Sequence, residues 1–410
     1  DTTDFIMGSQ SVSLTSDGAG GAVTTKKTSM TPFDTRGKTF KVWIKSTADH
    51  TQYEDLWFYA SSDNLVANFC LFKLEDASLT SDATYFQDST WMAMTVNMTK
   101  CVKTGNPDMS AINSLQFRIK DKSAGTINLK INKVALVSRP TEGVVSFTFD
   151  DGYDDDYTVA RRYMDEKGIA GTAYVVPELI DTPGYMSAVQ VKNLHEMNGW
   201  QIGAHTLDHK NLVSVSTSSA EQSLIANANW LAKNGYADGG MDLAYPNGSF
   251  DEFTVKPLCR KYFRSCRGIG NGNNDAITSI MESIPPADPY KLRVFNVQGD
   301  TATTTLIEMM RQAKDKGEWL IFILHRIVAT PDAADLGSEF PISVFQLLVG
   351  ETASSSIKVR TIADVLNNQN WQTLETVNQP VGIGSSSPVA AFSIEMSSSA
   401  VGSTTDVIQV

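Results

Sequence analysis

The feature that most restricts the possible folds of this chain is a series of short apolar runs after Pro140 that alternate with helical segments. Such alternation is typical of a parallel α/β sheet or barrel. The runs follow one another closely, which favours a barrel over a small open sheet. They lie at residues 144–149, 171–176, 200–204, 241–245, 263–269, 292–297 and 319–324. One helix is expected at 219–234, where Ser219 and Gln222 have the spacing of a capping box.

Residues 1–139 follow a different pattern, in which apolar and polar side chains alternate at period two. The clearest stretches are 39–45, 115–120 and 127–131, and turn-forming segments separate such stretches. Several strands at short spacing predict an all-β sandwich of the jelly-roll type. In its pattern this segment resembles the sandwiches of carbohydrate-binding modules, which implies an ancillary domain over 1–139.

Charge and hydropathy exclude several classes of function. Lysine and arginine total 34 against 46 aspartate and glutamate residues, a formal net charge of −12. Such an acidic chain is a poor match for nucleic acid or an anionic membrane surface. The apolar run at 319–324 is far shorter than the roughly 20 residues of a membrane span, so no transmembrane helix is expected. The first residues lack the regions of a signal peptide, which indicates either removal of an upstream part or no export by that route.

The four cysteines leave the redox state open. Cys70, Cys101, Cys259 and Cys266 form no Cys-x-x-Cys pair, which argues against a zinc knuckle or a thioredoxin motif. Two disulfides and four buried thiols are both compatible with the sequence.

The segment 376–410 is rich in serine and glycine. One interpretation is a loosely ordered tail. In the other, Val381-Gly-Ile-Gly followed by Ser-Ser-Pro resembles segments of trimeric phage tail-fibre and tailspike proteins. That resemblance implies oligomerisation through this segment, as a homotrimer, and an extracellular place in a virion tail. A secreted bacterial protein is the alternative.

Two adjacent carboxylates, Asp150 and Asp151, follow the first apolar run after Pro140. The carboxyl ends of strands hold the active site in barrels and open parallel sheets. Two neighbouring carboxylates repel each other unless a cation or a strong donor neutralises one of them. Because their side chains diverge, one can face a metal while the other faces a water. The alternative is a solvated acidic loop, since residues 154–156 are also aspartates.

His205 and His209 follow the third run, at a spacing that puts two imidazoles on one face of a helical turn. Two histidines and one carboxylate, with positions left for water and substrate, are typical of a catalytic metal site. An ordinary surface helix would explain the histidine pair alone, but the acidic pair at another strand end favours the metal.

Two further segments complete the candidate site. Tyr245-Pro246-Asn247-Gly248 predicts a tight loop whose backbone N–H groups can serve as oxyanion donors, although an ordinary turn explains the segment equally well. His325 follows the last run, where its position at a strand end favours a general acid or base over a buried core histidine.

Four motifs together resemble the polysaccharide deacetylases of carbohydrate esterase family 4. They are Thr148-Phe-Asp-Asp-Gly152, His205-Thr-x-x-His209, Ala244-Tyr-Pro-Asn-Gly248 and Leu324-His325, and the resemblance covers residues 143–370. It implies a distorted (β/α)7 barrel as a catalytic domain over 140–375. It also implies roles: Asp150 as general base, Asp151, His205 and His209 as metal ligands, and His325 as general acid. The N–H of Asn247, in the loop with Tyr245 and Pro246, would stabilise the oxyanion.

The chain departs from the family pattern in its third motif. Many members carry an arginine where this chain has Ala244 and an aromatic residue where it has Asn247. Members with the Ala-Tyr-Pro version often supply the arginine from a later strand, so Arg293 is the candidate that would hold Asp150 in place. The sequence does not identify the carboxylate expected behind His325.

The resemblance, together with these residues, implies a metal-dependent deacetylase that removes N- or O-linked acetyl groups from a cell-surface polysaccharide. The metal would be one divalent cation, with Zn²⁺ favoured and Co²⁺ or Mn²⁺ also compatible. One alternative is a catalytically silent carbohydrate-binding adhesin or tail protein, with recognition in the sandwich. Another is a peptidoglycan deacetylase.

Overall fold

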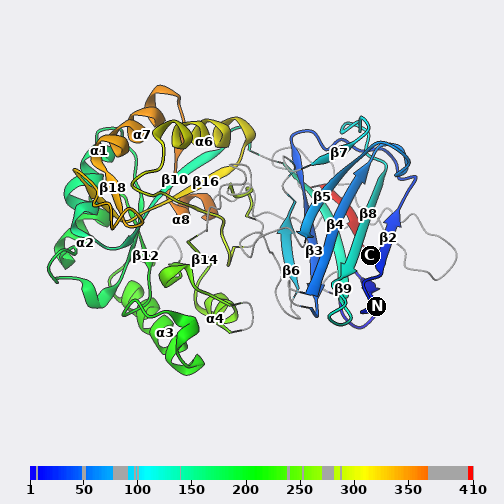
Figure 1. The fold of residues 1–410 in the computed structure, drawn as a ribbon, viewed down its shortest axis with the longest axis horizontal. Coiled ribbons are helices and arrows are strands. Elements are labelled where there is room, and N and C mark those ends of the chain that lie inside the picture. Colours follow the sequence, from blue (N-terminus) through cyan, green and yellow to red (C-terminus); the bar gives the residue numbers. More distant parts are fainter. Residues whose placement is uncertain are drawn as a thin grey trace. The chain divides into compact units, whose positions relative to one another are not determined.

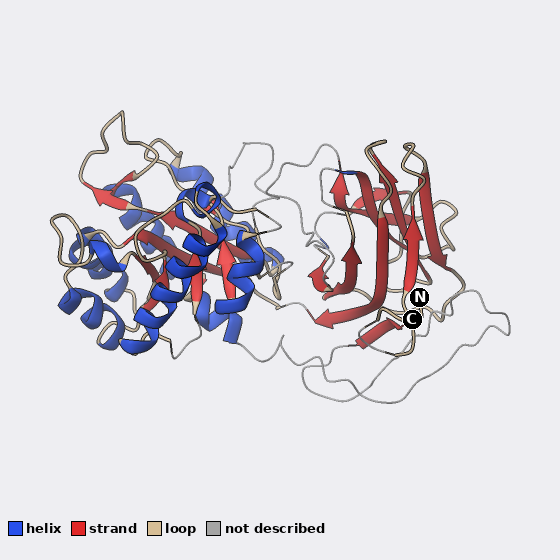
Figure 2. Cartoon of the chain, turned by 90° about the horizontal axis from the view of Figure 1, so that it is seen from below, coloured by secondary structure: helices blue, strands red, loops and turns tan. Residues whose placement is uncertain are grey.

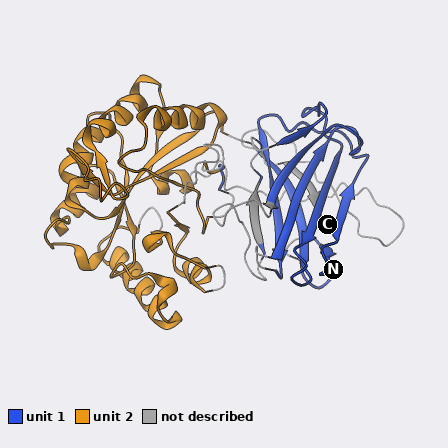
Figure 3. Cartoon of the chain, in the orientation of Figure 1, with its two compact units in different colours: residues 1–139, 283–288, 369–410 blue, residues 140–282, 289–368 orange. Residues whose placement is uncertain are grey.

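A computed structural model describes residues 1–5, 8–48, 52–76, 91–96, 98, 101–138, 140–237, 241–251, 254–269, 281–286, 289–367 and 405–409. It divides into two compact units (Figure 3). The first comprises residues 1–139, 283–288 and 369–410, and the second comprises 140–282 and 289–368. The tail motif at 381–388 lies outside the described residues. Across the described part of the chain, no helix combines the length and apolarity needed to cross a membrane.

The first unit consists of two antiparallel sheets, which confirms the expected all-β region (Figure 2). One has the order β1-β9-β3-β6 and the other β2-β8-β4-β5-β7. The jelly-roll topology stays a prediction. The strands are β1 (Val12–Thr15), β2 (Ala22–Lys27), β3 (Lys38–Ser46), β4 (Tyr53–Ser61), β5 (Phe69–Asp76), β6 (Met92–Thr95), β7 (Val102–Thr104), β8 (Ser114–Asp121) and β9 (Asn128–Ser138).

The core of this unit lies between the two sheets. Phe40 of β3 and Phe58 of β4 are fully buried, and their rings meet edge to face with centroids 5.0 Å apart. Phe117 of β8 adds a third ring, 4.8 Å from Phe58. Alternating side chains therefore fill the space between the sheets, as the period-two pattern predicts.

Strand β9 joins segments that are far apart in the sequence. Residues 128–131 pair with β1, and residues 133–136 pair with β20 (Thr405–Gln409). The opposite edge of β9 pairs with β3 over nearly its whole length. The last described segment of the chain thus forms a strand within the chain's own first unit.

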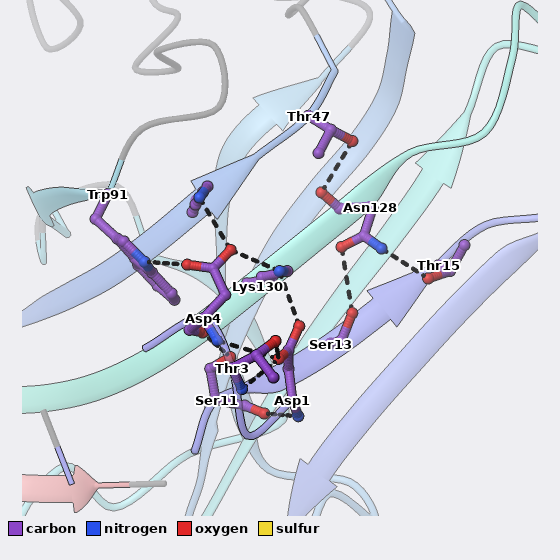
Figure 4. A network of polar contacts seen from close by, with 11 residues as sticks. Asp1, Thr3, Asp4, Ser11, Ser13, Thr15, Thr47, Trp91, Asn128 and Lys130 are labelled. Atoms are coloured by element: carbon purple, nitrogen blue, oxygen red, sulfur yellow. Dashed lines mark hydrogen bonds and ion pairs between the residues drawn. The ribbon is translucent and has the colours of Figure 1, made fainter. Parts of the chain in front are cut away.

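A polar network fixes the segment ahead of β1 to this sheet (Figure 4). The Asp4 carboxylate accepts hydrogen bonds from Lys130 Nζ at 2.6 Å, Lys45 Nζ at 2.9 Å and Trp91 Nε1 at 2.9 Å. The two ammonium groups hold the pKa of Asp4 well below its usual range. Lys130 also contacts the Asp1 carboxylate at 2.8 Å.

The second unit contains a parallel sheet with helices around it (Figures 1 and 2). Its order is β14-β13-β12-β11-β10-β16-β15, and β19 (Lys358–Val359) pairs with the start of β10. Each of the seven predicted runs contributes one strand of this order. They are β10 (Val144–Asp151), β11 (Thr172–Val175), β12 (Gln201–Ala204), β13 (Asp242–Ala244), β14 (Ser265–Arg267), β15 (Phe295–Asn296) and β16 (Trp319–Leu324).

This sheet is consistent with the expected β/α barrel. An isolated parallel bridge between Arg267 and Leu292 links β14 to the segment ahead of β15. The helices are α1 (Arg161–Asp165), α2 (Ala188–Glu196), α3 (Thr217–Lys233), α4 (Val255–Tyr262), α6 (Thr303–Lys316), α7 (Ile342–Ser354) and α8 (Ile362–Asn367).

Two local details differ from, or add to, the sequence expectations. Helix α3 begins before Ser219, because the side chain of Ser216 caps it by accepting a hydrogen bond from the Ser219 N–H. The cysteines form two disulfides, Cys70–Cys101 and Cys259–Cys266, so of the two states left open by the sequence the structure contains the oxidised one.

Candidate active site

The candidate residues lie at the carboxyl ends of neighbouring strands in the second unit. β10 ends in Asp150 and Asp151, β12 leads to His205, and β16 leads to His325. Because parallel strands end at the same edge of a sheet, these side chains share one region. At the end of β10 the backbone turns sharply, with φ of 74° at Asp151 and 81° at Gly152. This turn sends the two adjacent carboxylates toward different partners.

Asp151 lies beside both histidines. Its Oδ1 is 3.4 Å from His205 Nε2 and 3.2 Å from His209 Nε2. Burial alone would raise the pKa of Asp151, but the two imidazoles hold it well below its usual range. In turn, Asp151 raises the pKa of His209. The histidines are carried by an irregular turn with positive φ at Thr206 and His209, not by a regular helix.

The three side chains fit a divalent cation. Their ligand atoms lie within 4.8 Å of one another. Two ligand atoms bound to one tetrahedral Zn²⁺ by bonds of about 2.1 Å lie roughly 3.4 Å apart. The distances from Asp151 Oδ1 to the two histidine Nε2 atoms agree with this value. The other ring nitrogen of His205, Nδ1, is 2.8 Å from the Ala244 carbonyl oxygen. Such a contact fixes the tautomer that leaves Nε2 free for a metal.

Asp150 forms a buried ion pair with Arg267, at the end of β14. The side chains are 4% and 1% exposed, and Arg267 Nη2 contacts Asp150 Oδ1. Arg267 Nη1 also donates to the Gly268 carbonyl oxygen at 3.2 Å, and its guanidinium lies over the Tyr174 ring. The ring and the carbonyl oxygen hold the Arg267 guanidinium in place, and the ion pair in turn holds the Asp150 carboxylate.

The expectation that Arg293 holds Asp150 is therefore wrong, since Arg267 occupies that place. Arg293 precedes β15, where its backbone N–H donates to Glu282 at 3.1 Å and its Nη1 donates to the Met281 carbonyl oxygen at 3.3 Å. The signal for Arg267 was present in the sequence. The run at 263–269, which became β14, contains two arginines, and Arg267 is the one that stands at the carboxyl end of the strand.

We expect Arg267→Gln to reduce kcat by about 10- to 100-fold, the usual effect of losing a group that orients a reacting residue. Arg293→Gln makes the same change at a half-buried arginine that bonds Glu282 and Met281, and should change kcat far less. The comparison uses acetate release, the activity that the sequence predicts, measured on folded protein that is checked by circular dichroism. Equal losses in both variants would contradict the role of Arg267.

His325 directly follows Leu324, which pairs with Phe149, so its place in the sheet is beside that of Asp150. Burial lowers the pKa of His325, and the charges of Asp150 and Asp151 oppose this effect. Its Nδ1 is buried and has no hydrogen-bond partner among the residues that the structure describes. The carboxylate expected behind this histidine is therefore not found in that part of the chain.

The loop after β13 forms a single helical turn at Pro246–Gly248. Tyr245 is buried, donates its hydroxyl to the Tyr290 carbonyl oxygen at 3.2 Å and stacks on Phe250. Asn247 is exposed and has a φ of 56°. This places an exposed backbone turn next to the strand that carries Ala244, the partner of His205.

The acidic stretch after Gly152 is not a solvated loop. Asp155 and Asp156 are 6% and 0% exposed, and Asp150 is 2% exposed. Asp155 accepts a hydrogen bond from the backbone N–H of Ile327, two residues after His325. Tyr153 stacks on Tyr185 with ring centroids 5.0 Å apart. Sequence reasoning missed these contacts because both partners are far from them along the chain.

Comparison with known proteins identifies relatives of part of the second unit. The family model for polysaccharide deacetylases matches residues 138–260. A Bacillus subtilis (strain 168) protein, "Putative polysaccharide deacetylase YxkH", is 30% identical over 118 residues, which cover 29% of this chain and 42% of the relative. The match thus spans less than half the length of that curated relative. Arg267 and His325 lie beyond the residues that the family model matches.

Solved structures with similarity to this chain include two enzymes of related description. One is the chitin deacetylase of the fungal pathogen Colletotrichum lindemuthianum, with 15% identity, 57% of this chain and 92% of that chain covered, and a TM-score of 0.38. The other is PdaA of Bacillus subtilis, a family 4 carbohydrate esterase, with 16% identity, 56% and 82% covered, and a TM-score of 0.36.

Proposed function

We propose that this chain, whose residues 138–260 match the family model for polysaccharide deacetylases, hydrolyses acetyl groups, N- or O-linked, on a cell-surface polysaccharide. One observation carries this proposal. The cluster Asp151, His205 and His209 lies next to a second carboxylate, Asp150, which a buried arginine fixes in place. A metal site alone would not need that second carboxylate, whereas hydrolysis by an activated water does.

Asp151, His205 and His209 would hold one divalent cation, for which we favour Zn²⁺ while Co²⁺ and Mn²⁺ also suit these donors. When bound, such a cation polarises a carbonyl oxygen and acidifies a water. Two imidazoles and one carboxylate leave positions for water and substrate, as in catalytic sites.

The remaining roles belong to side chains of this chain. Asp150 accepts the proton of the attacking water, and Arg267 holds that carboxylate in position. The backbone N–H of Asn247, in the turn with Tyr245 and Pro246, stabilises the oxyanion that develops on the acetyl group. His325 donates a proton to the nitrogen or oxygen that leaves with the sugar.

The proposal is tested by incubating the protein with a panel of acetylated glycans and measuring released acetate. We expect release from at least one N- or O-acetylated polysaccharide, and the pattern across capsule-like, chitin-like and peptidoglycan substrates identifies the class. Glycan binding without any acetate release would instead favour the silent adhesin.

We expect about one equivalent of divalent cation per chain in protein purified without added metal, measured by elemental analysis. Asp151→Ala and His205→Ala each remove a donor, and both should lose most of this cation. His195→Ala, which alters a histidine on α2, is the matched control and should keep it. Full occupancy in the first two variants would show that the ligand set is wrong.

We further propose that the protein acts outside the cell, because its substrate lies at a cell surface. The homotrimer implied by the resemblance of residues 381–388 to tail-fibre segments stays a prediction.

A further inference from the structure

A buried carboxylate connects the two loops that carry the candidate catalytic residues. Asp155 lies at the start of the helical segment that follows Asp150 and Asp151, and its Oδ1 accepts a hydrogen bond from the Ile327 N–H at 2.9 Å. Ile327 follows His325 by two residues and is itself buried. The strands that lead into these loops, β10 and β16, are direct neighbours in the sheet (Figure 1).

The same carboxylate reaches a second group of the His325 loop. Asp155 Oδ2 is 3.5 Å from Arg326 Nε, and Arg326 Nη1 is 3.0 Å from Glu339 Oε1. The Arg326 guanidinium also lies 5.8 Å from the centroid of the Tyr153 ring. Burial raises the pKa of Asp155 to about 6, and the Ile327 N–H and Arg326 act against that rise, so the group is ionised at pH 8.

The contact with Asp155 bears on the ring of His325 through the backbone. Its buried Nδ1 has no hydrogen-bond partner within the described part of the chain. A ring without such a partner takes its position from its own backbone and from packing. The Asp155 contact holds that backbone two residues further on, and it does so from the loop that carries Asp150 and Asp151.

We infer that Asp155 is a positioning residue that sets the distance between His325 and the Asp150–Asp151 pair. The inference rests on the proposed function and deepens it, because it assigns the alignment of acid and base to one hydrogen bond between their loops. A misplacement of about 1 Å can cost on the order of 100-fold in rate, so loss of this bond should be visible in kcat.

The test compares Asp155→Ala with Asp155→Asn, at pH 8, on an N-acetylated glycan and on an activated aryl acetate. Alanine removes the acceptor for the Ile327 N–H, whereas asparagine keeps an acceptor oxygen at the same place. We expect Asp155→Ala to lose about 10- to 100-fold in kcat on the glycan, since only amide cleavage depends strongly on a positioned acid. On the aryl acetate Asp155→Ala should lose less than about threefold in kcat. Asp155→Asn should lose less than about threefold in kcat on both the glycan and the aryl acetate.

A second measurement separates positioning from a general structural effect. In a His325→Ala background, Asp155→Ala should cause little further loss of kcat on the glycan. The reason is that Asp155 acts through the imidazole of His325, which this background lacks. Asp63→Ala removes a carboxylate that holds backbone N–H groups in the first unit, and should leave both activities unchanged. If Asp155→Ala does not fold, Asp155→Ser, whose hydroxyl is too short for this contact, is measured in the same way.

Equal losses on the two substrates, or a full additional loss in the His325→Ala background, would overturn the inference. These outcomes differ from failure of the proposed function. In that case the unmodified protein itself would release no acetate from any N- or O-acetylated glycan.

Discussion

Asp150→Asn should lower kcat by about 10²–10⁴-fold on amide and ester substrates alike, the usual contribution of a general base. Both substrates are attacked by the same water, and its proton must be removed whichever group leaves. Asparagine has nearly the size of aspartate and keeps an oxygen toward Arg267, but it cannot accept that proton at neutral pH. The measurement is kcat for acetate release from an N-acetylated glycan and from an aryl acetate.

The matched control for this variant lies in the same acidic loop. Asp154→Asn makes the identical change four residues later, outside the pair with Arg267, and should leave kcat within about twofold. The cation content of Asp150→Asn should stay at one equivalent, because Asp151 and both histidines are intact. A large loss on only one of the two substrates would argue against Asp150 as the base.

His325→Ala should lose about 10²–10⁴-fold on an N-acetylated glycan and far less on an activated aryl acetate. An amine is a poor leaving group and must gain a proton as the C–N bond breaks, whereas a phenolate leaves without one. Comparing kcat for the two substrates therefore isolates the donation of a proton from every other role of this side chain.

His195→Ala serves as the control for this change, because His195 contacts the Trp200 carbonyl oxygen and the Tyr236 ring away from the site. It should leave the ratio of the two rates unchanged. A His325→Ala variant that lost equally on both substrates would point to substrate positioning or support of the metal site instead of acid catalysis.

Much of the fold could be predicted from local pattern. The alternation of residues such as Phe40 and Val42 with polar neighbours predicts a strand with one buried face, and β3 buries Phe40, Val42 and Ile44 completely, although several residues between them are buried as well. The apolar run at 319–324 predicts a strand buried on both faces, and β16 is fully buried. Both patterns follow from side-chain periodicity within a few residues, so they do not depend on distant parts of the chain.

The candidate site could be predicted where its members follow strand ends directly. Asp150, Asp151, His205 and His325 all stand immediately at or after an apolar run, and parallel strands bring such positions to one edge. The sequence also showed that Asp150 and Asp151 must have different partners, because adjacent side chains diverge. It did not show which arginine would approach Asp150.

That choice depended on tertiary structure. Arg267 ends β14, four strands from β10 in the sheet order, whereas Arg293 precedes β15, only two strands from β10. The strand order alone would favour Arg293, and it is the packing of side chains across the carboxyl edge of the sheet that brings Arg267 to Asp150. The disulfide pairing and the contact of Asp155 with Ile327 also depended on tertiary structure. The distance between two residues along the chain does not show how far apart they lie in space. The sequence by itself thus determined the strands, the all-β region and the chemical types at the strand ends, because local periodicity encodes them. The ion pair of Asp150 and the bond between the acid and base loops were decided by packing across the sheet, which local pattern does not encode.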